Sequence, residues 1–532
     1  MKPSLRYVTA QQLKVWIHDE DELALLDVRE HGQFGEEHLF FAVPLPFSEL
    51  ELHIGRLVPR TKTRVVLYGD QNTEYAVQAS VQAMVHLGYG NVQILDGGIE
   101  AWKAAGYRTF AGVNLPSKTF GEMAEHVYGT PRVSAEDLHR LLSEGTESVL
   151  IVDGRPFPEY RKMNIPSAIC CPNGELALRI GELAPDPDTT IIVNCAGRTR
   201  SIVGAQTLIN LGIPNKVYAL ENGTQGWYLA DLPLEHNSNR LYPKKISPQN
   251  LNTSRARAQE LRRRFELQHV DAKTVKHWLQ GTTRSVFLCD IRTDEEHAQG
   301  DLPAIVQHAP GGQLIQATDQ YIGVLKSTIV LCDTDGVRAP VIASWLKQLG
   351  RTVYLLDELD GLHDLPQPLR YKPRLSHTRK LPFEALQDFL NTNPKALVLD
   401  ARPSLEFREA SILGAQWITR AKIPAIPARQ HPYAVLLLGT NKDKLALLAQ
   451  DMEANAHTDI YLCIVDDSFP NAVGVPVVEN HKMPDDACID YLFFVHDRHD
   501  GNKEAARKYL EWETNLLSQI DEHERRVFAI EP

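Results

Sequence analysis

Hydrophobic residues recur along the chain in short runs separated by amphipathic stretches, and the same arrangement returns four times. Each arrangement opens on an apolar run that ends in aspartate, with arginine two positions later. These openings lie at 25–29, 151–155, 288–292 and 398–402. A second apolar run follows, and then a helix-like segment and a third short run. The second runs lie at 65–68, 191–194, 329–331 and 435–438.

Short apolar runs that alternate with helical segments are typical of βαβ units, and continuous apolar strands indicate a parallel sheet buried on both faces. A chain of 532 residues is too long for one hydrophobic core. We therefore predict an α/β fold of four tandem domains, each a central, mostly parallel sheet with helices on both faces, plus a C-terminal helical extension. The predicted bounds are 1–113, 131–238, 265–370 and 380–480, with the extension at 481–532.

The segments outside the repeats predict two connectors and one long helix. Residues 114–130 carry no strand pattern, so we expect a connector there. Residues 239–264 are polar and basic, which favours a solvated linker with a helix after Asn252. Good helix formers from Glu504 to Arg526 predict a single helix, which we expect to pack on the fourth domain.

Composition narrows the class of protein without identifying its activity. Hydrophobic residues make up 43% and charged residues 23% of the chain, which is typical of globular domains. No run approaches the roughly 18 apolar residues that a membrane span needs, and the N-terminus lacks the apolar stretch of a signal peptide. A net charge of −12 argues against nucleic acid as the main partner. Because the seven cysteines are odd in number and scattered, we expect free thiols in a reducing compartment, hence a cytoplasmic protein.

In the second repeat, the apolar run at 191–194 leads into a loop suited to thiol chemistry. Cys195 follows the second run of the second repeat, and a helix is expected from about Ser201. A thiol at a helix N-terminus lies among unpaired backbone N–H groups and at the positive end of the helix dipole, which favours the thiolate. Arg198 and Arg200 add positive charge, and Gly197 lets the loop amides converge on the sulfur. The plain alternative is a buried strand-end cysteine, but the glycine and two arginines favour a nucleophile.

The loop Cys-Ala-Gly-Arg-Thr-Arg-Ser at 195–201 resembles the active-site loop of rhodaneses. Asp153-Gly154-Arg155 and the segment 221–227 match motifs that flank this loop in the family, and 96–102 matches in the first repeat. The resemblance covers nearly the whole chain, which is similar to multidomain bacterial rhodanese-related sulfurtransferases. It is strongest in the first two repeats and weakest in the fourth.

The resemblance implies a two-step sulfur transfer. The Cys195 thiolate would take the outer sulfur of thiosulfate or a related small anionic donor and release sulfite. The resulting persulfide would pass its sulfur to cyanide, a thiol or a protein acceptor, and no metal or organic cofactor is required. Asp153 and Arg155 are expected to support the loop, while its two arginines orient the anion. Substrate contacts are implied for Ala196, Gly197, Arg198, Thr199, Arg200 and Ser201.

The other three repeats lack this combination of residues. The loop of the first repeat contains two acids and no cysteine, and that of the fourth also lacks a nucleophile, so both are expected to be silent. Cys332 in the third repeat is followed by Asp333 and Asp335, which would raise its pKa and repel anions. The spacing from Cys332 to Arg338 resembles that of rhodanese-related phosphatases, but the two acids disfavour phosphate. We expect Cys332 to be inert or auxiliary.

The remaining thiols and a histidine cluster have simpler interpretations. Cys171 is a candidate resolving thiol, although packing in the core is the leading interpretation. Cys289 and Cys463 lie within apolar runs and are expected in the core. Alternating His and Asp at 496–500 could suggest a metal site, but the sequence has no third ligand at a suitable spacing, so a turn is expected.

Three classes of function stay open at this point. The leading one is an enzyme, a thiosulfate or related sulfurtransferase with its active site in the second domain. A non-enzymatic persulfide carrier or scaffold is the alternative, since three of the repeats look silent. A phosphatase is disfavoured, because the step from Cys195 to Arg200 is one residue shorter than the phosphate-loop spacing.

Overall fold

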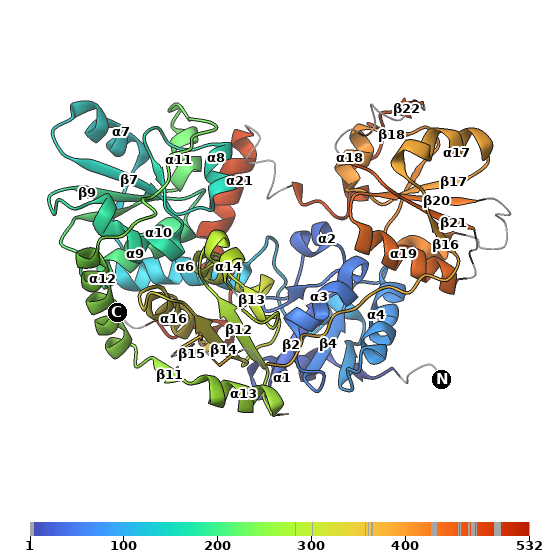
Figure 1. Ribbon diagram of the computed structural model, residues 1–532, viewed down its shortest axis with the longest axis horizontal. Coiled ribbons are helices and arrows are strands. Elements are labelled where there is room, and N and C mark those ends of the chain that lie inside the picture. Colours follow the sequence, from blue (N-terminus) through green and yellow to red (C-terminus); the bar gives the residue numbers. More distant parts are fainter. Residues whose placement is uncertain are drawn as a thin grey trace. The chain divides into compact units, whose positions relative to one another are not determined.

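The structure is a computed structural model (Figure 1). The described residues are 5–281, 283–300, 302–356, 358–359, 361–362, 365–426, 434–455, 457, 459–466, 469, 474, 476–493 and 502–530. Within them the chain forms four five-stranded sheets and one small two-stranded sheet. Every pairing within the five-stranded sheets is parallel, and helices flank each sheet, so the predicted α/β repeat fold is confirmed.

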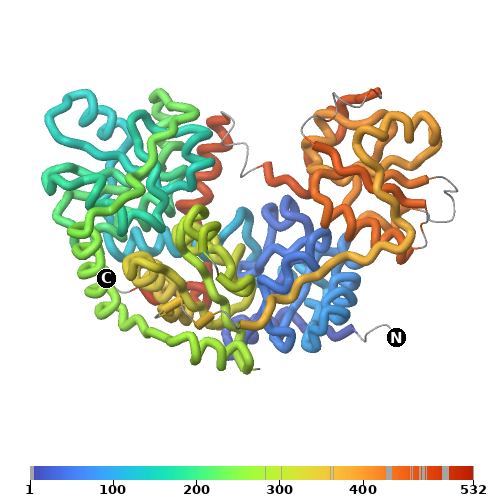
Figure 2. The backbone as a smooth tube through the Cα atoms, in the orientation of Figure 1, coloured from blue at the N-terminus to red at the C-terminus, as the bar shows by residue number. Residues whose placement is uncertain are grey.

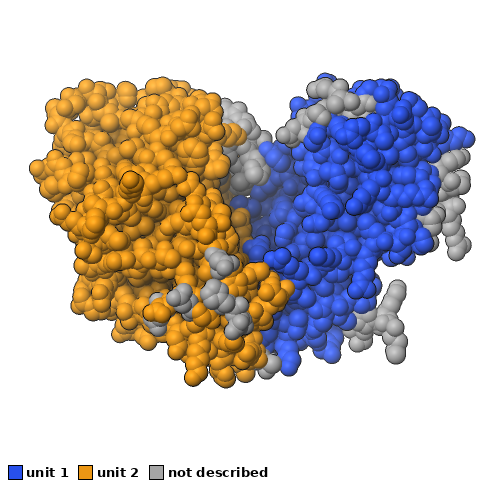
Figure 3. Space-filling view, viewed as in Figure 1, with its two compact units in different colours: residues 1–17, 23–113, 369–493 blue, residues 18–22, 114–368, 494–532 orange. Residues whose placement is uncertain are grey.

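Two compact units divide the chain (Figure 3). One unit contains residues 1–17, 23–113 and 369–493, so the first and fourth repeats belong together. The other contains 18–22, 114–368 and 494–532, which brings in the second and third repeats and the C-terminal segment. In the trace of Figure 2, the chain leaves the first unit after residue 113 and returns to it at residue 369. The bounds of four separate domains stay a prediction.

The first and fourth repeats share one strand order, in which the first strand of the repeat lies at one edge and the second strand lies beside the third. The first sheet runs β1 (Tyr7–Val8), β5 (Val92–Leu95), β4 (Arg64–Tyr68), β2 (Leu23–Asp27), β3 (Val43–Pro44). Its helices are α1 (Ala10–His18), α2 (His31–Glu36), α3 (Leu50–Leu57), α4 (Glu74–His86) and α5 (Gly98–Ala104). The fourth sheet runs β16 (Thr378–Lys380), β21 (Ile460–Ile464), β20 (Val435–Gly439), β17 (Leu397–Asp400), β19 (Gln416–Trp417). Its helices are α17 (Leu386–Thr392), α18 (Ser404–Glu409) and α19 (Lys442–Ala454), and β18 (Ser411–Ile412) pairs with β22 (Val477–Val478).

The second and third repeats follow the same order. The second sheet runs β6 (Arg132–Val133), β10 (Val217–Leu220), β9 (Thr190–Asn194), β7 (Val149–Asp153), β8 (Ile169–Cys170). Its helices are α7 (Ala135–Glu144), α8 (Phe157–Lys162), α9 (Asn173–Leu183), α10 (Thr199–Asn210) and α11 (Gly223–Leu229). The third sheet runs β11 (Gln268–Val270), β15 (Thr352–Leu356), β14 (Thr328–Cys332), β12 (Val286–Asp290), β13 (Val306–His308). Its helices are α13 (Ala272–Gln280), α14 (Asp294–Gln299), α15 (Gly311–Gln316) and α16 (Arg338–Gln348).

The second sheet is buried on both faces, as the continuous apolar strands predict. Ile191 and Val193 pack in one core cluster with residues of α9 and α10. Ile192, which points to the opposite face, packs in another with Leu138 of α7 and Trp227 of α11. The end of β9 therefore lies between two layers of helices.

The segments outside the repeats differ from the predictions in three ways. The expected connector 114–130 contains a helix, α6 (Leu115–Tyr128), which packs along α10 and ends at Gly129 in the left-handed region. The single helix expected from Glu504 to Arg526 is instead three: α21 (Lys503–Thr514), α22 (Leu516–Gln519) and α23 (Glu522–Arg525). The second break lies where Asp521 caps the start of α23.

The third difference is where the C-terminal segment packs. We expected it on the fourth domain, but α21 lies against α6 and α11 of the second unit, and α22 also contacts α6 (Figure 1). The linker contains a helix, as predicted, but α12 (Pro248–Arg264) begins before Asn252 rather than after it.

Candidate active site

Cys195 lies directly after β9, four residues before α10 begins. The register of β7 and β9 pairs Asp153 with Asn194, so the cysteine opens the loop at the carboxyl end of the sheet. Its side chain is buried, with 2% of its surface exposed. The sulfur lies 3.6 Å from Oγ of Ser201, whose hydroxyl donates to the carbonyl of Arg198 at 2.7 Å.

The start of α11 fixes the loop backbone. The amide of Thr224 donates to the carbonyl of Cys195 at 2.8 Å, and the amide of Gln225 donates to that of Ala196 at 3.0 Å. Gly223 adopts φ 54°, and a side chain there would strike the carbonyl of Cys195. This glycine therefore lets the start of α11 approach the loop closely enough to bind two loop carbonyls.

Asp153 and Arg155 form a buried ion pair behind the loop. Nε and Nη2 of Arg155 lie 2.9 and 2.7 Å from the two carboxylate oxygens of Asp153. The amide of Asn194 donates to the same carboxylate at 2.8 Å, which connects the pair to the residue before Cys195. Equivalent pairs occur in the other repeats: Arg29–Asp27, Arg292–Asp290 and Arg402–Asp400. Since all four repeats keep the pair, it stabilises the fold whether or not the loop carries a thiol.

Arg198 is buried and bound by acids from α6. Its Nε and Nη2 lie 2.7 and 2.8 Å from the carboxylate of Glu122, and Nη2 also contacts Glu125. Burial lowers the pKa of Arg198, but these carboxylates outweigh it and leave the pKa raised. Sequence reasoning missed both glutamates because it predicted no helix over 114–130.

Arg200 is also engaged with an acid. Its two terminal nitrogens lie 2.9 and 2.7 Å from the carboxylate of Glu159 on α8. Burial lowers the pKa of Arg200, but Glu159 outweighs this, and a charge on Cys195 would raise the pKa of Arg200 further. The guanidinium thus lies within electrostatic reach of the sulfur, as the position of both residues in one short loop predicts.

The C-terminal helix α21 closes over the loop. Oγ1 of Thr199 donates to the carboxylate of Glu513 at 2.9 Å, and Nζ of Lys118 lies 3.4 Å from the same oxygen. Lys118 also contacts the hydroxyl of Tyr509. A methyl group at Gly197 would lie 3.1 Å from Oε2 of Glu513. Side chains distant in sequence therefore bury the sulfur-bearing loop.

The strand register places Cys332 differently from Cys195. Cys332 is the last residue of β14 and pairs with Asp290, as Asn194 pairs with Asp153. The counterpart of Cys195 in the third repeat is therefore Asp333. Burial raises the pKa of Cys332 well above its usual value, and nearby Cys289, Asp290 and Asp333 add to that rise.

Arg338 of the third repeat occupies the place of Arg200. It pairs with Glu296 on α14, as Arg200 pairs with Glu159 on α8, and it also binds Asp335 and Glu175. Three acids thus surround one arginine in a loop without a thiol at its opening position.

Cys171 lies in the core rather than on the loop. It packs with Val152 and Val193 in one hydrophobic cluster, and burial raises its pKa well above the usual value. All seven cysteines are buried and free. Cys289 and Cys463 each lie within a strand, as expected.

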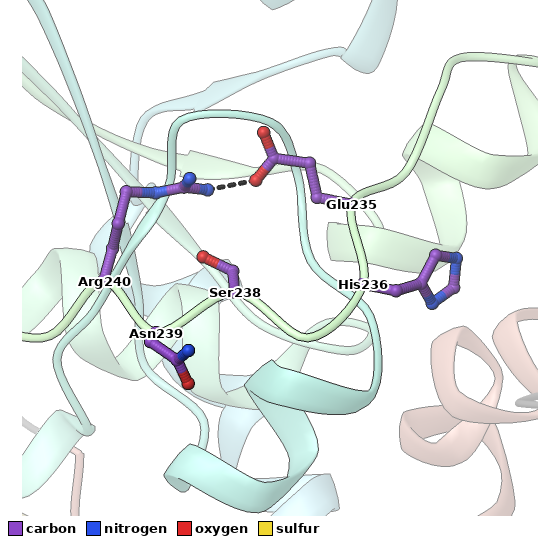
Figure 4. A pocket seen from close by; sticks show the side chains of 5 residues that line it. All are labelled: Glu235, His236, Ser238, Asn239 and Arg240. Carbon is purple, nitrogen blue, oxygen red and sulfur yellow. Dashed lines mark hydrogen bonds and ion pairs between the residues drawn. The ribbon is translucent and has the colours of Figure 1, made fainter.

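A shallow hollow near the end of the second repeat is lined by five polar side chains (Figure 4). Its lining residues are Glu235, His236, Ser238, Asn239 and Arg240. Arg240 pairs with Glu235, Ser238 contacts the hydroxyl of Tyr160 at 2.8 Å, and His236 faces the carbonyl of Lys162 at 2.7 Å.

No helix in the described part of the chain is both long and apolar enough to cross a membrane. The described residues also contain no group of three His, Cys, Asp or Glu side chains arranged to hold a metal ion. The His and Asp cluster at 496–500 lies outside the described residues.

Comparison with known proteins identifies relatives of this chain. The Rhodanese-like domain family matches residues 9–105 and 134–230. The chain is similar to a thiosulfate sulfurtransferase from Pseudomonas aeruginosa, with 36% identity, a TM-score of 0.88 and 99% of each chain covered. An HTH-type transcriptional regulator from Mycobacterium tuberculosis is 32% identical over 115 residues, which is 22% of this chain and 50% of that protein. The chain therefore matches about half the length of that curated relative.

Proposed function

The chain belongs to the rhodanese family, and we propose that it is a sulfurtransferase that carries sulfur on Cys195. The observation that carries the proposal is a comparison of the four repeats at the position of Cys195. Where the strand register aligns the loops, the second repeat has a thiol, while the others have Gly69, Asp333 and Gly439. One repeat in four can therefore hold a persulfide at this place.

In the proposed first step, the Cys195 thiolate attacks the outer sulfur of thiosulfate or a related donor. A new S–S bond forms on Cys195, the S–S bond of the donor breaks, and sulfite leaves with the electron pair. Arg198 and Arg200 supply positive charge for the anion and for the charge that develops on the leaving group. Amides and side chains of residues 196–201 complete the donor contacts.

In the second step, cyanide, a thiol or a protein acceptor attacks the terminal sulfur of the persulfide. The bond to Cys195 breaks, and the thiolate is regenerated with its electron pair. The residues assigned here need no metal or organic cofactor. We place the protein in the cytoplasm, where a free thiol stays reduced.

A second candidate is a non-enzymatic persulfide carrier or scaffold. The observation in its favour is that Cys195 is 2% exposed and that α21 packs on its loop at Gly197 and Thr199. In that case Cys195 would accept sulfur but would not turn over between donor and acceptor.

One assay separates these functions. The purified protein receives thiosulfate and cyanide, and thiocyanate is measured for wild type, Cys195→Ala and Cys332→Ala. We expect multiple turnovers in wild type and Cys332→Ala and none in Cys195→Ala. Full activity in Cys195→Ala would refute the proposal, and a single sulfur added to Cys195 without turnover would support the carrier. Mass spectrometry of the Cys195 peptide detects the added sulfur.

A further inference from the structure

A cavity of about 460 Å³ lies at the loop of the fourth repeat, within the first compact unit. Its walls include Gly439, which stands where Cys195 stands in the second repeat, because Asp400 pairs with Leu438 as Asp153 pairs with Asn194. The cavity therefore occupies the place of an active site but has no nucleophile there.

The walls of the cavity contain polar atoms without a hydrogen-bond partner. Oγ of Ser404 and Oγ1 of Thr419 are buried and unpaired, and the two side chains are 0% and 9% exposed. Oδ1 of Asp490 is likewise unpaired, although its other oxygen accepts from the amide of Ser404 at 3.0 Å. Leaving such groups buried and unsatisfied costs free energy, which points to a polar ligand.

The charges around the cavity favour a cation. Three basic side chains line it, and each already faces acids: Arg402 faces Asp400, Arg420 faces Glu51 and Asp451, and Lys444 faces Glu49. Glu30, Glu406 and Asp490 are further acids on the walls, and Arg402 also lies 3.9 Å from Glu406.

Lys422 also acts on these acids, although it does not line the cavity. Its Nζ lies 4.2 Å from the centre of the Trp417 ring, and its charge interacts with Asp490 and Glu30. Counted together, the seven acids named here outnumber these four Lys and Arg side chains, so the cavity and its surroundings keep an excess of negative charge.

We propose that this cavity binds a small primary amine as its ammonium ion, with Asp490 as the counter-charge and Ser404 and Thr419 as hydrogen-bond acceptors. An ammonium group has three donors and no acceptor, which suits three unpaired oxygens. Trp417 and Tyr491 also line the cavity, and aromatic faces attract organic cations.

Saturation-transfer NMR with the full chain tests the proposal, using propylamine as the probe and propan-1-ol and propionate as matched compounds of similar size. We expect binding of propylamine and of neither matched compound. Asp490→Asn should weaken binding about tenfold or more, because it removes a charged acceptor. Asp486→Asn, an exposed acid nearby in sequence, should bind as wild type does.

Three results would overturn the proposal: no propylamine binding by wild type, equal binding by Asp490→Asn, or preferred binding of propionate. Circular dichroism establishes that each variant is folded. Ser404→Ala provides a second variant if Asp490→Asn is not folded, and it too should weaken propylamine binding. Undiminished binding by a folded Ser404→Ala would count against the proposed contact.

Discussion

Arg198 and Glu122 form a buried ion pair in which two guanidinium nitrogens lie 2.7 and 2.8 Å from the carboxylate oxygens. The arginine belongs to the loop that carries Cys195, whereas the glutamate belongs to α6, outside the repeat. An anionic donor that uses Arg198 must therefore compete with a carboxylate that is already in place. We therefore expect binding of the donor to be coupled to the charge of Glu122.

This coupling predicts a pH dependence of donor binding. Burial raises the pKa of Glu122 to about 7, and Glu513 and Glu125 add to the rise while Arg198 opposes it. Below that pH the carboxyl is protonated and holds Arg198 less strongly, so KM for thiosulfate should fall as the pH drops from about 8 to about 6. Steady-state assays across this range measure it.

Two variants control for other titrating groups. Glu122→Gln should have a low KM that no longer changes over this range, because its side chain carries no charge at any pH. Glu136→Gln, an exposed residue on α7, should keep the wild-type profile. If Glu122→Gln kept the same pH dependence as wild type, Glu122 would not be the group responsible.

The sequence predicts the four sheets and the Cys195 loop because both depend on local pattern. It does not predict the partners of that loop, because they come from far along the chain. Glu513 lies 314 residues after Thr199 and belongs to a helix that was expected on another domain. Buried contacts between residues so far apart along the chain leave no periodic signal in the sequence.

Cys332 illustrates a second limit of sequence reasoning. It stands 42 residues after Asp290, as Cys195 stands 42 residues after Asp153. Yet the register leaves Cys332 inside its strand and Cys195 beyond its own. The third repeat has one more residue between its paired positions, Asp290 and Cys332, than the second repeat has between Asp153 and Asn194. Spacing alone does not show whether the cysteine lies inside the strand or after its end.

The Asp–Arg pairs offer a comparison between two repeats. Asp153→Asn and Asp400→Asn each leave a buried guanidinium without its charged partner, which costs about 3 kcal/mol or more. Both variants should therefore unfold at lower temperature in a thermal melt. Only Asp153 also accepts from Asn194, the neighbour of Cys195, so only Asp153→Asn should lose sulfur transfer while folded. Equal activity in the two folded variants would argue that the pair has no role beyond stability.

Gly121 tests how tightly α6 packs on the active loop. A methyl group there would lie 2.6 Å from Cγ2 of Thr199 and 3.2 Å from its backbone Cα. Helix propensity alone predicts that Gly121→Ala stabilises by about 1 kcal/mol, whereas overpacking costs about 1–3 kcal/mol. Because backbone stands in the way, we expect a lower melting temperature and slower sulfur transfer. Gly90→Ala, which has open space around it, should melt as wild type does, and a more stable Gly121→Ala would show that the two helices can move apart.

Glu513 connects the C-terminal helix to the loop and should control access to Cys195. Its carboxylate accepts from Thr199 and pairs with Lys118, and its side chain is 1% exposed. Removing these charged contacts in Glu513→Ala should loosen α21 and speed alkylation of Cys195 by iodoacetamide about tenfold. The rate is measured by mass spectrometry of the Cys195 peptide at short times.

Two controls accompany this measurement. Glu511→Ala, an exposed site on the same helix, should leave the rate unchanged. Labelling of Cys332 should stay slow in both variants, because its high pKa disfavours the thiolate. Equal Cys195 rates in wild type and a folded Glu513→Ala would mean that α21 does not limit entry to the site.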